Sequence, residues 1–170
     1  HANRVLPSIS DLNVLMNNKG PNLTICPTGS VRDVYIASSY GQLNLTSTIA
    51  PWVTLPNNES YYAAGKSGLT TMAHIMIRDA LNALQATGFN FSQFDTDGDG
   101  YIDAIGFFHS GYAAEFGGTD AYGANYINRI WSHQWALSSL TGMKWTSNTG
   151  QSVYTYHISP SVWGTSGGAI

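Results

Sequence analysis

Residues 95–103 contain four aspartates, and the repulsion among their carboxylates limits the structures that this segment can adopt. Asp95, Asp97 and Asp99 occupy positions one, three and five of a loop, with Gly100 at position six, as in the opening half of an EF-hand calcium loop. Two carboxylates about 4 Å apart repel by roughly 1 kcal/mol in water and by about 4 kcal/mol when partly buried. The loop would therefore open unless a cation neutralised it.

Hard oxygen ligands in this spacing favour calcium over zinc. The sequence predicts a structural calcium site formed by the side chains of Asp95, Asp97 and Asp99, the backbone carbonyl of Tyr101, and the carboxylate of Asp103. Such an ion would fix the junction between a helix and the strand that follows.

The loop departs from a complete EF-hand. Position twelve, where a bidentate glutamate is expected, is Gly106, and the next segment is typical of a strand. Glu115 could complete the calcium shell or have no specific role. The alternative to a calcium site is a solvated acidic turn.

Hydrophobic periodicity predicts a long helix at about residues 67–86, with Gly88 as its C-terminal cap. His74 in this helix is expected to be exposed or hydrogen-bonded. After the aspartate loop, residues 102–109 are predicted to form a central strand. Residues 128–137 and 153–158 are further strand candidates.

Two short helices are predicted nearer the N-terminus. One begins at Ser8 and contains Leu12 and Met16, and the other opens with a capping box formed by Ser30 and Asp33. Alternation predicts a half-buried strand at 42–48 paired with a second strand at 52–55. Helices and strands in this mixed order indicate an α/β or α+β domain.

Charged residues make up 10% of the chain, against about 25% in a typical soluble protein. A surface built from uncharged polar residues favours an extracellular location. Seven basic residues scattered along the chain exclude a nucleic-acid-binding stripe, and no apolar run is long enough for a membrane span. The N-terminus has no signal-peptide pattern, so we expect any signal to be removed or to lie outside this sequence.

Cysteine and asparagine residues add two open questions. Cys26, the only cysteine, is either a partly buried thiol or the partner of a cysteine elsewhere. Four N-x-Ser/Thr sequons would carry glycans in a eukaryotic secretory protein; they lie at Asn22, Asn44, Asn58 and Asn90.

A family resemblance is carried by six motifs in the same order. They are 30–35 with 39–43, 52–56 with 61–62, 94–103, 108–111, 114–118 and 130–135. In this order the motifs resemble the N-terminal half of secreted zinc metallopeptidases of the immune inhibitor A type. The resemblance implies a zincin-like twisted mixed sheet with packed helices. It also implies that residues 1–170 are a partial domain that continues beyond both ends.

In the family that this chain resembles, zinc is held by H-E-x-x-H on a helix and activates water for attack on a peptide. None of the five histidines belongs to such a motif; they are His1, His74, His109, His133 and His157. The resemblance therefore places zinc, and a peptide or protein substrate, with the remainder of the same domain. The chain alone is expected not to hydrolyse peptides.

Ser132 and His133 are adjacent on a predicted strand and so should point to opposite faces, which argues against a nucleophile–base pair. This segment resembles the aromatic edge strand on which zincins hold extended substrates. His109 is expected to hydrogen-bond to backbone.

The leading hypothesis is that this chain is part of a secreted, calcium-stabilised zinc metalloendopeptidase. The alternative is a non-catalytic extracellular glycoprotein module that uses a peptidase-like scaffold for assembly or adhesion.

Overall fold

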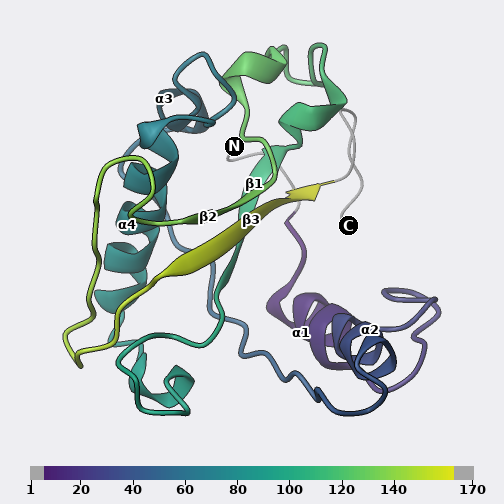
Figure 1. Cartoon of the computed structure of the whole chain (residues 1–170). Coiled ribbons are helices and arrows are strands. Elements are labelled where there is room, and N and C mark those ends of the chain that lie inside the picture. Colours follow the sequence, from purple (N-terminus) through teal and green to yellow (C-terminus); the bar gives the residue numbers. More distant parts are fainter. Residues whose placement is uncertain (1–5, 163–170) are drawn as a thin grey trace. The chain divides into compact units, whose positions relative to one another are not determined.

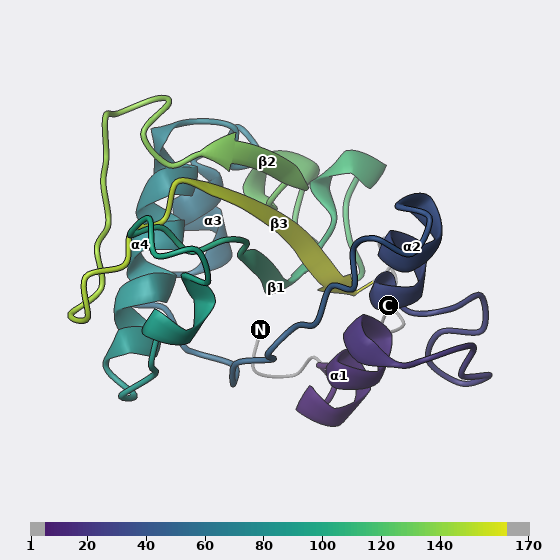
Figure 2. The same ribbon diagram turned by 60° about the horizontal axis from the view of Figure 1, so that its bottom comes forward.

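The structure is a computed structural model that describes residues 6–162 of the 170-residue chain. The chain divides into two compact units (Figures 1 and 2). The smaller unit is Pro7–Trp52, and the larger unit contains the described residues from Val53 onward. Each unit is described by itself.

The smaller unit contains the two short helices that the sequence predicts, α1 (Ile9–Asn17) and α2 (Val31–Ser38). The Ser8 hydroxyl accepts a hydrogen bond from Asp11 N and so caps α1.

The predicted capping box opens α2. The Ser30 hydroxyl accepts from Asp33 N, and the Asp33 carboxylate accepts from Ser30 N. Backbone hydrogen bonds from Ser30 and from Gly20 hold the pKa of Asp33 below its ordinary value. The Cys26 side chain is buried, and its Sγ lies 3.8 Å from the Val14 carbonyl oxygen.

The predicted hairpin over 42–55 is wrong, because no strand forms there. The side-chain amide of Asn17 satisfies the backbone of Ser47 instead: Ser47 N donates to Oδ1 at 2.7 Å, and Nδ2 donates to Ser47 O at 2.8 Å. Leu43, which was expected on the buried face, is 46% exposed. Alternation over a few residues cannot tell a strand from an extended segment that side chains hold in place.

The larger unit is an α+β structure, as predicted. Its helices are α3 (Glu59–Ala63) and α4 (Thr71–Gln85), and its strands are β1 (Gly106–Tyr112), β2 (His133–Ala136) and β3 (Thr155–Val162). Three single-turn 3₁₀ helices lie between them at Ser92–Phe94 (η1), Ala114–Phe116 (η2) and Tyr126–Asn128 (η3). The strands form one mixed sheet of order β1-β3-β2, with β1 parallel and β2 antiparallel to β3 (Figure 1).

The long helix begins later than its sequence period predicts. Ser67 and Gly68 both have positive φ, which an α-helix cannot contain, and Thr70 then caps α4 through Met72 N. The helix ends at Gln85, and Gly88 has φ +81°, as expected of a residue beyond a helix end. The short helix α3 was not predicted, although Asn58 is a recognisable N-cap for it.

Strand positions also differ from the sequence prediction. The strand expected at 102–109 lies at 106–112, and within the described residues β3, not β1, is central. Ile102 is instead joined to Ser152 by a backbone hydrogen bond before β1 begins. The candidate at 128–137 shortens to 133–136, because η3 occupies its start.

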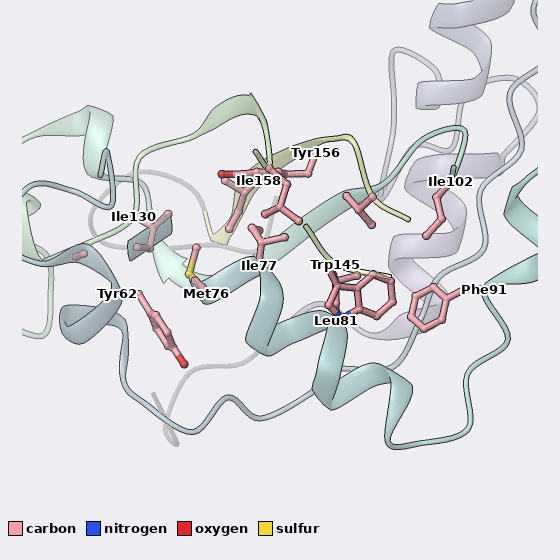
Figure 3. Packing of buried hydrophobic residues seen from close by; sticks show 13 residues of the cluster. Tyr62, Met76, Ile77, Leu81, Phe91, Ile102, Ile130, Trp145, Tyr156 and Ile158 are labelled. Carbon is pink, nitrogen blue, oxygen red and sulfur yellow. The ribbon is translucent and has the colours of Figure 1, made fainter. Parts of the chain in front are cut away.

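The core of the larger unit lies between α4 and the sheet. Met76, Ile77 and Leu81 of α4 face Tyr156 and Ile158 of β3 (Figure 3). Trp145 fills the end of this core beside Phe91 and donates from Nε1 to Asn82 Oδ1 at 2.9 Å. Within residues 6–162, no helix is both long and apolar enough to cross a membrane.

Candidate metal centre

Backbone hydrogen bonds close the aspartate loop on itself and join it to the segment that precedes β3. Asp103 N donates to Phe94 O, which closes the loop on η1. Ser152 N donates to Gly100 O, and Ile102 N donates to Ser152 O, so the loop is paired with the segment that leads into β3. Two backbone hydrogen bonds therefore connect the loop with the segment that leads into the central strand.

Three carboxylates converge inside the loop. Asp95, Asp97 and Asp99 each offer an oxygen, and these oxygens all lie within 4.8 Å of one another. Gly98 and Gly100 have φ of +75° and +85°, which allows the tight turn that brings the alternate side chains together. Hydrogen bonds within the loop stabilise the turn: Asp97 Oδ1 accepts from Asp99 N, and Asp99 Oδ1 accepts from Tyr101 N.

Asp95 carries the observation that points to a ligand. Its Oδ2 accepts from Gly100 N at 3.2 Å, whereas its Oδ1 is buried and has no hydrogen-bond partner. A buried carboxylate oxygen without a partner costs free energy, and a cation at the centre of the three carboxylates would remove that cost. The donor set of carboxylate oxygens fits calcium.

The other predicted calcium ligands have different surroundings. The Asp103 carboxylate accepts from Thr96 Oγ1 at 2.5 Å and lies outside the group of three. The Tyr101 ring is exposed and stands edge-on to Tyr154, with ring centroids 6.2 Å apart. Thr96 was not singled out from the sequence, because a single threonine in an acidic loop carries no signal of its own.

Glu115, which could have completed the shell, is bonded elsewhere. Its carboxylate accepts from Ser132 Oγ at 2.5 Å and from Ser132 N at 3.3 Å. Glu115 thus anchors the segment just before β2.

Three histidines of the larger unit, His74, His109 and His133, occupy different environments. The prediction for His109 is confirmed, because its Nδ1 accepts from Gly111 N at 3.1 Å; it also lies 3.5 Å from Glu59 Oε1. The prediction for His74 is wrong, because the side chain is fully buried and neither ring nitrogen has a partner. His74 shares the apolar face of α4 with Ile77 and Leu81, a spacing of three and seven that the sequence already contained.

His133 opens the antiparallel edge strand β2, and Trp135 on the same strand contacts its ring, with centroids 4.6 Å apart. This confirms the aromatic edge strand within the described sheet. Ser132 is bonded to Glu115, whereas His133 Nε2 bonds to the Tyr156 hydroxyl, so the two residues serve separate contacts.

The side-chain oxygens of all four sequon asparagines accept hydrogen bonds, and these bonds are local except for that of Asn44. Asn58 caps α3, Asn90 Oδ1 accepts from both Ser92 N and Ser92 Oγ, and Asn44 Oδ1 accepts from Arg32 Nε. These three residues are exposed, whereas Asn22 is half-buried and accepts from the backbone of Thr24 and Ile25.

Comparisons with known proteins agree with the motif order. The model of the family described as "Immune inhibitor A peptidase M6, catalytic domain" matches residues 16–168. A protein named "Immune inhibitor A" from Bacillus thuringiensis subsp. alesti is 29% identical over 128 residues, which cover 62% of this chain. The match spans only 18% of the length of that relative.

Proposed function

This chain belongs to the immune inhibitor A peptidase M6 family, and on that premise we propose that it is part of a secreted, calcium-stabilised zinc metalloendopeptidase. The observation that carries the proposal is the match of the catalytic-domain model to residues 16–168. A peptidase of this family acts on peptides or proteins, and these are the proposed substrates.

The residues present do not fit a catalytic zinc site. None of the five histidines belongs to H-E-x-x-H, and within residues 6–162 the group of acidic, histidine or cysteine residues able to hold a metal is the aspartate cluster. We therefore derive no catalytic step from these side chains. The zinc is proposed to be held by further sequence of the same domain, which makes that sequence the first partner of this chain.

The same observation supports a second candidate, a non-catalytic extracellular module that keeps the peptidase scaffold for assembly or adhesion. The two candidates differ in whether a zinc-binding helix follows in the complete polypeptide. The sequence of the complete polypeptide, or its zinc content after purification, decides between the two candidates.

Strand β2 offers a docking site for an extended peptide. Leu137 N donates to Tyr154 O, so in the antiparallel ladder the odd-numbered residues of β2 bond to β3. The backbone N–H and C=O groups of Gln134 and Ala136 consequently point away from β3. A substrate strand could pair with these groups, as in β-strand addition.

A peptidase assay tests the proposed activity. The complete polypeptide with zinc is expected to cleave an unstructured protein substrate, and the 170-residue chain alone is expected to show no turnover. N-methylation of the substrate amide that pairs with β2 should reduce kcat/KM by about tenfold, the loss of roughly one hydrogen bond. Robust turnover by the 170-residue chain, or none by the zinc-loaded complete polypeptide, would contradict the proposal.

Calcium is proposed to be held by Asp95, Asp97 and Asp99, with Asp103 and the Tyr101 carbonyl as further ligands. When bound, it neutralises the carboxylates and contributes no reacting group. The buried, unpartnered Oδ1 of Asp95 supports this role. Because the loop is hydrogen-bonded to Ser152, the ion would stabilise the approach to β3.

Secretion is supported by the low charge content of 10%. If the protein passes through a eukaryotic secretory pathway, glycans are expected on the exposed Asn44, Asn58 and Asn90, and less readily on the half-buried Asn22. Intact-mass measurement before and after enzymatic deglycosylation checks this expectation. If deglycosylation leaves the mass of protein secreted from a eukaryotic host unchanged, the expectation of glycans is wrong.

A further inference from the structure

Two histidines lie at the contact between α4 and the edge strand. His74 of α4 is fully buried, and its ring stands edge-on to the rings of Trp135 on β2 and Tyr156 on β3, with centroids 5.8 and 6.1 Å away and interplanar angles of 87°. His133 of β2 contacts the same two aromatic rings, at 4.6 and 5.5 Å. The two imidazoles thus share one aromatic cluster, which spans three elements.

The hydrogen bonds of the two histidines differ. His133 Nδ1 lies 2.7 Å from Trp131 O, and its Nε2 lies 3.0 Å from the Tyr156 hydroxyl. Nδ1 must donate to the carbonyl; in the neutral ring Nε2 then accepts from the hydroxyl, whereas in the protonated ring Nε2 would donate to the hydroxyl oxygen. His74 has no hydrogen-bond partner at either nitrogen.

We propose that His74 and His133 form an acid-sensitive latch that holds the edge strand β2 on α4. At neutral pH both rings are uncharged and pack as aromatic groups. Protonation of His74 would place a charge and a second N–H donor in a site that offers no acceptor. The aromatic faces attract a cation, but more weakly than the loss of hydration opposes it.

The charged and titratable groups around the latch are bonded to other residues and do not offset the cost of protonating His74. On α4, Asp79 is paired with Arg78 and accepts from the Tyr62 hydroxyl of α3. Glu115 is bonded to Ser132 before β2 and acts on His133. The hydroxyl of Tyr156 on β3 is bonded to His133.

The pKa directions agree with this geometry. Burial lowers the pKa of His74 below its ordinary value of 6.5, and the neighbouring His133 lowers it further. Burial also lowers the pKa of His133, although the Trp131 carbonyl and Glu115 oppose that shift. Both groups bind fewer protons in the closed state than when exposed. The stability that they contribute is therefore complete above about pH 6.5 and falls as the pH drops below it.

The latch is tested by hydrogen exchange on the intact protein, followed by mass spectrometry and corrected for intrinsic exchange rates. Between about pH 7.5 and 5.5, each histidine that is neutral only in the closed state raises the opening equilibrium by about tenfold. We expect a rise of up to about a hundredfold for peptides covering β2 and the first turns of α4. Peptides covering α1 and α2 serve as the internal reference.

His74→Leu removes the titrating group and fills the apolar site, so its opening equilibrium should rise by no more than about tenfold over the same pH range. The matched control is His157→Gln on β3. Partial desolvation lowers the pKa of His157 too, but the residue as a whole is exposed and has no ring contact with the aromatic cluster of His74 and His133, so the control should keep most of the wild-type response.

An equal pH response in wild type and His74→Leu would overturn the latch. If His74→Leu does not fold, the imidazole titration of the wild-type protein, followed by NMR, decides the question instead. A pKa for His74 below 6.5 supports the latch, and a value at or above 6.5 refutes it. Neither measurement depends on peptidase activity, so failure of the latch and failure of the proposed function are separate outcomes.

Discussion

Removing calcium from the protein should lower the melting temperature of the domain by about 10 °C, and Asp95→Asn should produce much of the same loss in the presence of calcium. An ion present at about 1,000 times its dissociation constant stabilises the folded state by about 4 kcal/mol, and 1 kcal/mol corresponds to about 2–4 °C in a domain of this size. Asp95 is expected to be the most sensitive position of the proposed site, because its Oδ1 is buried and has no hydrogen-bond partner among the described residues. Differential scanning calorimetry with and without a chelator measures the shift.

Two further variants separate calcium binding from the effect of charge alone. Asp11→Asn changes an exposed carboxylate in the first turn of α1 and should leave the response to calcium intact. Asp103→Asn should cost less than Asp95→Asn, because the Asp103 carboxylate is already bonded to Thr96. No heat on calcium titration of the chelated protein, together with an unchanged melting temperature, would leave the loop as a solvated acidic turn.

Replacing Gly111 by alanine should destabilise the protein by about 3 kcal/mol or more, which is about 6–12 °C. A Cβ atom at this position would lie 1.9 Å from Glu59 Oε1 and 2.5 Å from Glu59 Cδ. The Glu59 side chain is only 9% exposed, accepts from Ile130 N and faces His109, so it cannot move aside without losing buried contacts. Thermal or denaturant unfolding measures the cost.

Gly106→Ala on the same strand is the matched control. A Cβ atom there would also clash, at 2.3 Å, but with the imidazole of His157, which is exposed and can rotate into solvent. We expect a loss below about 1 kcal/mol. A Gly111→Ala variant as stable as Gly106→Ala would mean that Glu59 is not fixed by its contacts.

Much of the local structure could be predicted from the sequence. The caps at Ser8 and Ser30 and the convergence of Asp95, Asp97 and Asp99 each depend on residues that lie within a few positions of one another. Local geometry alone closes such contacts, so spacing is sufficient to find them. The motif order in turn identified the family, which the match over residues 16–168 confirms.

The tertiary structure alone decided those contacts whose partners lie far apart in the chain. Asn17 and Ser47 replace the hairpin expected at 42–55, Glu115 binds Ser132 rather than the aspartate loop, and β3, from the end of the chain, becomes the central strand. His74 follows the same rule, since its burial depends on β2 and β3 covering α4. A residue's own neighbours in the sequence determine its caps and turns, but the elements that pack against it determine its burial and its hydrogen-bond partners.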